Sequence, residues 1–159
     1  MRLKTILNEK LEEFILVISF IILVTLVVLQ VFFRFVINLS IGWSEELARY
    51  LLIWIAWIAA SYAVHKSAHI RVEVVKDLFK STAKKIIELI VLLISFGFAV
   101  FLAVEGTRFV LAIKLTQQVS PSLEVDMWII YLAVPIGGIL MGFRFIQQMI
   151  YIFKKQVVK

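Results

Sequence analysis

The chain has 159 residues, of which 62% are hydrophobic, with 17 lysine and arginine residues against 11 aspartate and glutamate residues. A soluble domain of this length is about 45–50% apolar, so the excess, gathered in long runs, excludes a soluble protein and predicts a membrane protein. The chain has no cysteine, which excludes disulfides and cysteine-ligated clusters, and its basic residues lie between and outside the apolar runs, so no nucleic acid partner is expected.

The apolar runs predict an all-α integral membrane protein with a single domain over residues 1–159. A spanning helix needs about 20 residues, and four runs reach that length. The last two runs are longer, so tilt or protrusion into water is expected for them. The four predicted transmembrane helices cover about 14–36, 44–64, 86–113 and 127–153.

The distribution of basic residues predicts the orientation of the helices. The N-terminal segment, the second loop and the C-terminal tail are rich in lysine and arginine, whereas the first and third loops hold few. Positively charged loops stay in the cytoplasm. Both termini and the second loop are therefore expected in the cytoplasm, which agrees with an even number of spans.

The second helix is expected to begin at a charged stretch. Ser44 is a favourable N-cap, and Glu45 and Glu46 then lie in the first turn, where the helix dipole favours carboxylates. Glu45 and Arg49 are four residues apart, in the order that favours an ion pair. Capping does not explain why so much charge lies beside hydrocarbon, so contact with another polypeptide is the competing interpretation.

Two further features of the second helix suit packing. Aromatic residues on one side, among them Trp43 and Tyr50, suit the membrane interface or a packing partner. Small residues on another side allow close approach of a second helix. These small residues are Ala56, Ala59 and Ala63.

Residues 69–80 predict a short amphipathic helix at the cytoplasmic interface, between the second and third transmembrane helices. Apolar residues recur there at helical spacing, and charged residues take the other side. A solvated loop is the alternative. The apolar residues are Ile70, Val74, Val75, Leu78 and Phe79.

The third and fourth helices carry charges of their own. Glu105 and Arg108 lie three residues apart near the outer end of the third helix, either as an interfacial salt bridge or in contact with another subunit. Arg144 follows the close-packing motif Gly138-x-x-x-Gly142 and should reach a lipid phosphate or a carboxylate on a neighbour towards the cytoplasmic end.

No motif in the sequence indicates an enzyme or a cofactor. His65 and His69 lie at the cytoplasmic end of the second helix. A haem would need histidine ligands at membrane depth, and two histidines are too few for a typical zinc site. Hydrogen bonding at the interface is therefore expected for His69. A small proton-coupled multidrug exporter acting as a homodimer stays open as an alternative. It would need a titratable carboxylate deep in a helix, and Phe14 to Phe33 holds none.

The stretch from Arg34 to Glu73 resembles the signature region of the small, DctQ-like membrane subunit of tripartite ATP-independent periplasmic (TRAP) transporters. That family shows an arginine at the end of the first helix, then an asparagine, then W-S-E-E-x-x-R-Y and a later H-I-x-V-[DE]. The matching residues are Arg34, Asn38, Trp43, Ser44, Glu45, Glu46, Arg49, Tyr50, His69, Ile70, Val72 and Glu73.

The resemblance implies a subunit of the bacterial inner membrane that carries no transport site itself. A large DctM-like membrane subunit would hold the substrate and sodium sites, and a periplasmic DctP-like binding protein would capture an organic acid such as a C4-dicarboxylate or sialic acid. The small subunit would brace the large one and help dock the binding protein. Arg34, Asn38, Arg49 and the other charged or aromatic positions above would then meet a subunit or lipid.

Overall fold

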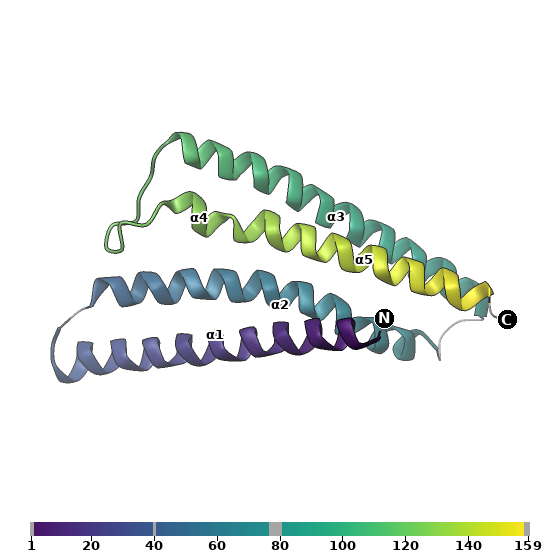
Figure 1. The fold of residues 1–159 in the computed structure, drawn as a ribbon, viewed down its shortest axis with the longest axis horizontal. Helices are drawn as coiled ribbons and strands as arrows, with labels where there is room; N and C mark the ends of the chain where they lie inside the picture. Colours follow the sequence, from purple (N-terminus) through teal and green to yellow (C-terminus); the bar gives the residue numbers. More distant parts are fainter. Residues whose placement is uncertain (1, 40, 77–80, 158–159) are drawn as a thin grey trace.

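The computed structural model of the chain describes residues 2–39, 41–76 and 81–157, and those residues form helices and connecting loops (Figure 1). The all-α prediction is confirmed, and four segments are long and apolar enough to cross a membrane. These segments are Glu12–Val36, Gly42–Val64, Ile86–Leu115 and Met127–Ile150. The helices are α1 (Arg2–Val36), α2 (Gly42–Lys76), α3 (Ser81–Leu115), α4 (Met127–Tyr131) and α5 (Ala133–Val157).

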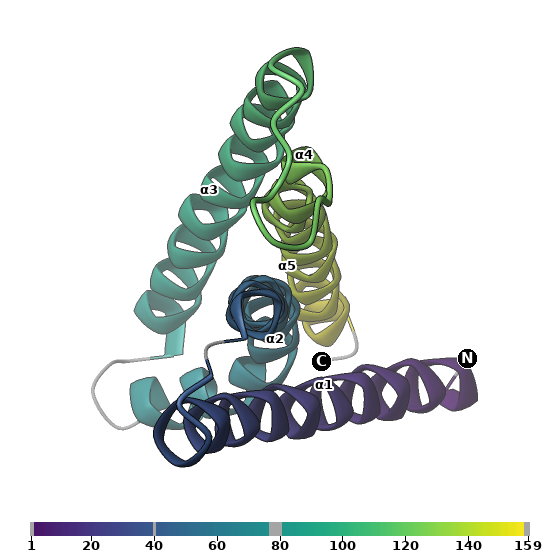
Figure 2. The ribbon, with the colours of Figure 1, turned by 90° about the vertical axis from the view of Figure 1, so that its left-hand side faces the viewer.

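The helices pack as two antiparallel pairs rather than as a closed bundle. α1 packs on α2, α3 packs on α5, and the pairs meet where α2 packs on α5. Figure 2 shows α1 and α3 splayed to opposite sides, with α2 and α5 between them. Both termini lie at one end of the molecule, here called the terminal end, and the α1–α2 turn and α3–α4 loop lie at the other, the loop end (Figure 1).

The turn between α1 and α2 fixes how the first pair is joined. Asn38 has a φ of 57°, a left-handed conformation that asparagine tolerates better than most residues, and the Leu39 N–H donates to the Phe33 carbonyl at 3.0 Å. α2 begins at Gly42, and the Ser44 hydroxyl donates back to the Ile41 carbonyl at 2.8 Å. The prediction of Ser44 as the N-cap is therefore wrong.

The predicted separate helix over 69–80 is not a separate element. α2 continues from its membrane span to Lys76, because no glycine or proline lies between Val64 and Lys76. Residues 77–80 lie outside the described residues. Figure 2 looks nearly along α2 and shows its last turns leaving the axis of the rest. An interfacial position for these turns stays a prediction.

The fourth span is divided at Leu132 into α4 and α5. Pro135 has no N–H to donate to the Tyr131 carbonyl four residues earlier, which is the physical reason for the interruption. Leu132 keeps helical dihedral angles, and the Ile136 N–H still reaches the Leu132 carbonyl at 3.1 Å. The helix is thus interrupted at Leu132, and the same apolar span continues in α5.

Glycines on α5 allow its neighbours to approach closely. A Cβ atom added at Gly138 would lie 2.8 Å from the backbone nitrogen of Ala103 on α3, and one at Gly137 would lie 2.9 Å from the Trp57 side chain on α2. At Gly142 the nearest atoms would be at 3.9 Å, an ordinary contact. Of the predicted Gly138–Gly142 pair, only Gly138 is therefore at a close crossing.

The predicted packing alanines of α2 differ in their exposure. Ala59 is half-buried and lines a shallow groove against α1, whereas Ala56 and Ala63 are exposed. The predicted role of Ala56 and Ala63 in helix packing stays a prediction. The described core lies instead between α3 and α5, where Leu92 and Phe145 pack beside a fully buried Ala99.

The Gly138→Ala variant should lower the free energy of unfolding by about 1–3 kcal/mol, because the new methyl group meets backbone atoms that cannot move aside. The midpoint of thermal unfolding, followed by circular dichroism in detergent, measures this loss. Gly142→Ala is the matched control and should be neutral or slightly stabilising. Equal midpoints for the two variants would contradict the assigned helix crossing.

Candidate functional site

The Glu46 carboxylate ties the start of α2 to the α3–α4 loop. Only 9% of Glu46 is exposed, and its Oε2 accepts from the backbone N–H groups of Ser122 at 3.1 Å and Leu123 at 3.0 Å. Two amides that converge on one carboxylate oxygen satisfy a charge that would otherwise be costly beside the membrane. Glu46 is therefore a clamp on the loop, a role that its spacing in the sequence does not indicate.

The loop that Glu46 holds also has hydrogen bonds within itself. Ser120 is almost fully buried, its N–H donates to the Val125 carbonyl at 2.9 Å, and its Oγ accepts from the Val125 N–H at 3.3 Å. Val119 and Asp126 form an antiparallel bridge. The loop thus presents a fixed backbone at the loop end of the molecule.

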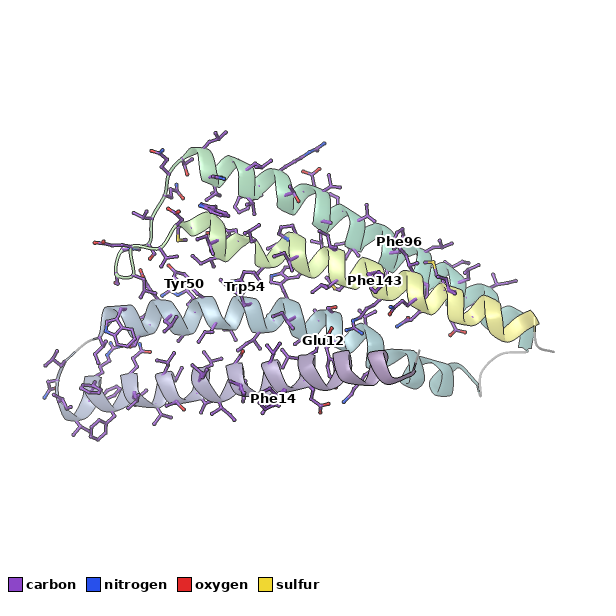
Figure 3. The ribbon with its side chains drawn as sticks, in the orientation of Figure 1. Glu12, Phe14, Tyr50, Trp54, Phe96 and Phe143 are labelled. Carbon is purple, nitrogen blue, oxygen red and sulfur yellow. The ribbon has the colours of Figure 1, made fainter. Side chains whose placement is uncertain are left out.

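The charged start of α2 has an inner and an outer side. Tyr50 lies one turn after Glu46 and faces α4, where its hydroxyl approaches the Met127 sulfur at 3.6 Å (Figure 3). Glu45 and Arg49 lie on the adjacent side, exposed, with an ion pair of 3.1 Å. Residues four apart share a helix face, so Glu46 and Tyr50 point to one side of α2 and Glu45 and Arg49 to the next. The polar atoms of Glu46 and Tyr50 therefore have partners within the chain.

Other predicted residues at the loop end are exposed. Trp43 and Arg34 lie on the surface, and the Arg34 guanidinium lies 6.0 Å from the ring centre of Phe35. Asn38 serves the turn through its backbone conformation. The Gln30 amide approaches Glu45 at 3.5 Å and links α1 to α2. This surface combines aromatic and charged side chains.

Arg144 lies in a polar cluster towards the terminal end. Its guanidinium forms an ion pair with Glu12 of α1, its Nε donates to the Ser61 hydroxyl of α2 at 3.3 Å, and only 11% of its side chain is exposed. The carboxylate thus comes from the same chain, not from a lipid or a neighbouring subunit as expected for Arg144, and the cluster joins three helices. Nearby, the Gln148 amide donates to the Val64 carbonyl.

A second contact lies beside this cluster. The Tyr62 hydroxyl donates to Glu13 at 3.1 Å, and the Lys66 ammonium lies 4.9 Å from the ring centre of Tyr62. The side chain of His69 lies outside the described residues, so its hydrogen bonding at the interface stays a prediction. Among the described side chains, no group of three histidine, aspartate or glutamate residues could hold a metal ion.

Glu105 and Arg108 form the predicted pair, with 2.7 Å between the carboxylate and the guanidinium. Their side chains are 45% and 72% exposed on the side of α3 away from α5. Gly106, between them, packs against Val134 and Pro135, well below the start of α4 at Met127. The pair is therefore level with the first turn of α5, and its depth in the membrane stays a prediction.

The residues that the sequence singles out thus divide into three places on the described structure. The loop end carries the Glu46 clamp and the exposed Glu45–Arg49 pair, the terminal end carries the Arg144 cluster, and α3 carries an exposed ion pair. None of these arrangements supplies a nucleophile–base pair among the described residues. They are suited to holding helices and loops in place.

Residues 23–155 match the family model described as "Tripartite ATP-independent periplasmic transporters, DctQ component". The chain belongs to the DctQ family. Family membership and four apolar helices identify it as a multi-pass membrane component of a transporter family. The alternative of a proton-coupled multidrug exporter finds no support in this match.

Named relatives agree with the family. The chain is 33% identical over 110 residues to the C4-dicarboxylate TRAP transporter small permease protein DctQ of Rhodobacter capsulatus, over 69% of this chain but only 48% of that protein. It is 28% identical over 156 residues to the sialic acid TRAP transporter small permease protein SiaQ of Vibrio cholerae, over 96% and 86% of the two chains.

A third relative is longer. The isethionate TRAP transporter permease protein DctMQ of Oleidesulfovibrio alaskensis is 26% identical over 149 residues, which are 90% of this chain and 24% of that protein. This DctQ-family chain therefore corresponds to about a quarter of a larger permease in that organism.

The Glu46→Ala variant should free the α3–α4 loop, because a hydrogen bond to a charged group contributes about 1.5–3 kcal/mol. Hydrogen exchange of the Ser122 and Leu123 amides, measured by mass spectrometry, should accelerate about ten- to a hundredfold. Glu45→Ala removes a neighbouring carboxylate that does not contact these amides and should leave their exchange unchanged. Unchanged exchange in Glu46→Ala would contradict the clamp.

Proposed function

We propose that the chain is the small membrane subunit of a TRAP transporter in the bacterial inner membrane, where it braces a large sodium-coupled DctM-like subunit. The observation that carries this proposal is that buried polar side chains form hydrogen bonds and an ion pair within the chain. Glu46, Ser61 and Arg144 are bonded to other parts of the same chain, as in a scaffold. A transport path would instead need polar groups that face a substrate or an ion.

The proposed orientation puts both termini in the cytoplasm. Support comes from the concentration of lysine and arginine in the N-terminal segment, the second loop and the tail. In that orientation the Glu46 clamp and its loop face the periplasm, and the Arg144 cluster lies towards the cytoplasm.

The loop end is the proposed docking place for a periplasmic DctP-like binding protein. A loop that is held in one conformation before binding loses less conformational entropy on association. Glu46 holds the α3–α4 loop by two hydrogen bonds. Val119, Pro121 and Glu124 are exposed on it. Trp43, Arg49 and the other exposed residues at the start of α2 are proposed to contact a subunit or lipid headgroups.

The proposed cargo class is an organic acid of the C4-dicarboxylate or sialic acid type. It rests on the names of the relatives, which include a C4-dicarboxylate and a sialic acid small permease protein. The cargo sites would lie in the other two proteins, so the choice between these acids does not depend on this chain.

The tagged chain, co-expressed with a large DctM-like subunit from the same organism, should co-elute with that subunit at equal stoichiometry in detergent. In liposomes the two together with the binding protein should take up radiolabelled succinate or sialic acid along a sodium gradient, and the chain alone should take up neither. Liposomes that hold the large subunit and the binding protein are the control and should show at least tenfold less uptake. Sodium-driven uptake by the chain alone would contradict the proposal.

A further inference from the structure

One face of α3 is exposed along the central part of the helix. The side that packs on α5 is marked by the buried Leu92, Ala99 and Val110. On the opposite side Phe98 and Phe101 stack with their ring centres 6.4 Å apart, and the Glu105–Arg108 pair follows one turn later. Residues 94, 97, 98, 101, 105 and 108 share this side of a helix with 3.6 residues per turn, and are here called the outer α3 face.

Contacts between helices fix the depth of the ion pair. Gly106 packs against Val134 and Pro135 of α5. On α5 these residues lie between Met127, which Tyr50 of α2 approaches, and Gly137, which meets Trp57 of α2. The pair is therefore level with the part of α2 between Tyr50 and Trp57, which is the middle of the span Gly42–Val64.

An ion pair at that depth does not suit a lipid-covered surface. An ionised side chain at the centre of a membrane helix costs about 2.5–3.5 kcal/mol, and lipid tails offer no hydrogen-bond partner. The contact with Glu105 uses one N–H group of Arg108, whereas a guanidinium has five. The outer α3 face is thus polar enough to favour a protein neighbour over lipid.

The exposed face of α1 provides the contrast. Phe20, Val24 and Val28 are exposed there, and the Thr25 hydroxyl donates to the Ile21 carbonyl of its own helix at 2.8 Å. No ion pair lies between residues 14 and 29 on that described face. Its composition suits contact with lipid tails.

The outer α3 face also has the shape of a helix-packing surface. A Cβ atom added at Gly97 would meet nothing within 4 Å, so another helix has room to approach there. Beside it, Ile94 and Phe98 line an open apolar groove of about 300 Å³ with Met141 and Phe145 of α5. Such a groove suits the apolar side chain of a neighbouring helix.

We infer that the outer α3 face is the surface on which the large membrane subunit docks, an inference that rests on the proposed function. The docked helix would place small or apolar side chains against Gly97 and Phe101. At the depth of Glu105 and Arg108 it would supply a hydrogen-bond acceptor or a carboxylate. The large subunit is favoured over a second copy of this chain because, in the isethionate relative, this chain corresponds to about a quarter of one longer permease protein.

Cross-linking in the assembled complex tests this assignment, and the absence of cysteine from the chain makes single-cysteine variants simple. Phe101→Cys labels the outer α3 face, and Phe20→Cys on α1 is the matched control, since the two phenylalanines are 57% and 56% exposed. With a photoactivatable benzophenone attached, the Phe101→Cys variant should cross-link to the large subunit at least fivefold more than the Phe20→Cys variant.

Charge removal gives a second readout. The double variant Glu105→Gln, Arg108→Gln should keep the thermal midpoint of the purified chain and reduce co-elution of the large subunit about tenfold. Cross-links from position 101 only to lipid or to a second copy, with the wild-type complex intact, would overturn the docking face and leave the proposed function standing. Failure of the wild-type chain to bind the large subunit would overturn both.

Discussion

The contact of Arg144 with Glu12 and Ser61 is the interaction on which the arrangement of the helices depends. In a bilayer, apolar surface between helices brings no hydrophobic gain, because lipid tails are as apolar as leucine. Helices are then ordered by polar contacts and by close approach of small residues. α1 needs this most, since most of its span is exposed and, among the described side chains, Glu12, Glu13 and Gln30 make its polar contacts with α2 and α5.

Close packing of helices also fixes their arrangement, in addition to the polar contacts. Gly137 and Gly138 bring α5 against α2 and α3, so α5 and α2 form the middle of the molecule and α1 and α3 are left at its sides. At the loop end Glu46 binds the α3–α4 loop to the start of α2. The same interactions thus hold the helices in place and fix the surface that they present, as a bracing subunit requires.

The sequence alone predicts the helices well and the direction of side chains poorly. Apolar runs of about 20 residues reveal the spans because lipid imposes both length and composition. Spacing also predicts the Glu105–Arg108 pair, since residues three apart are neighbours on any helix. It cannot show that Glu46 turns to a loop 76 residues away or that Arg144 meets Glu12, because those contacts depend on how the helices pack. Ala56 and Ala63 show the same limit, since their small size suits packing but they lie on an exposed side.

The central claim is that polar contacts hold α1 to the rest of the chain. It is tested most directly by double electron–electron resonance between spin labels at Ile15→Cys on α1 and Ile146→Cys on α5, in lipid. The account predicts one narrow distance distribution in the parent chain and in a Glu105→Ala background, and a clearly broadened one when Glu12→Ala is added. An unchanged distribution with Glu12→Ala would contradict it, because apolar contacts would then suffice to position α1.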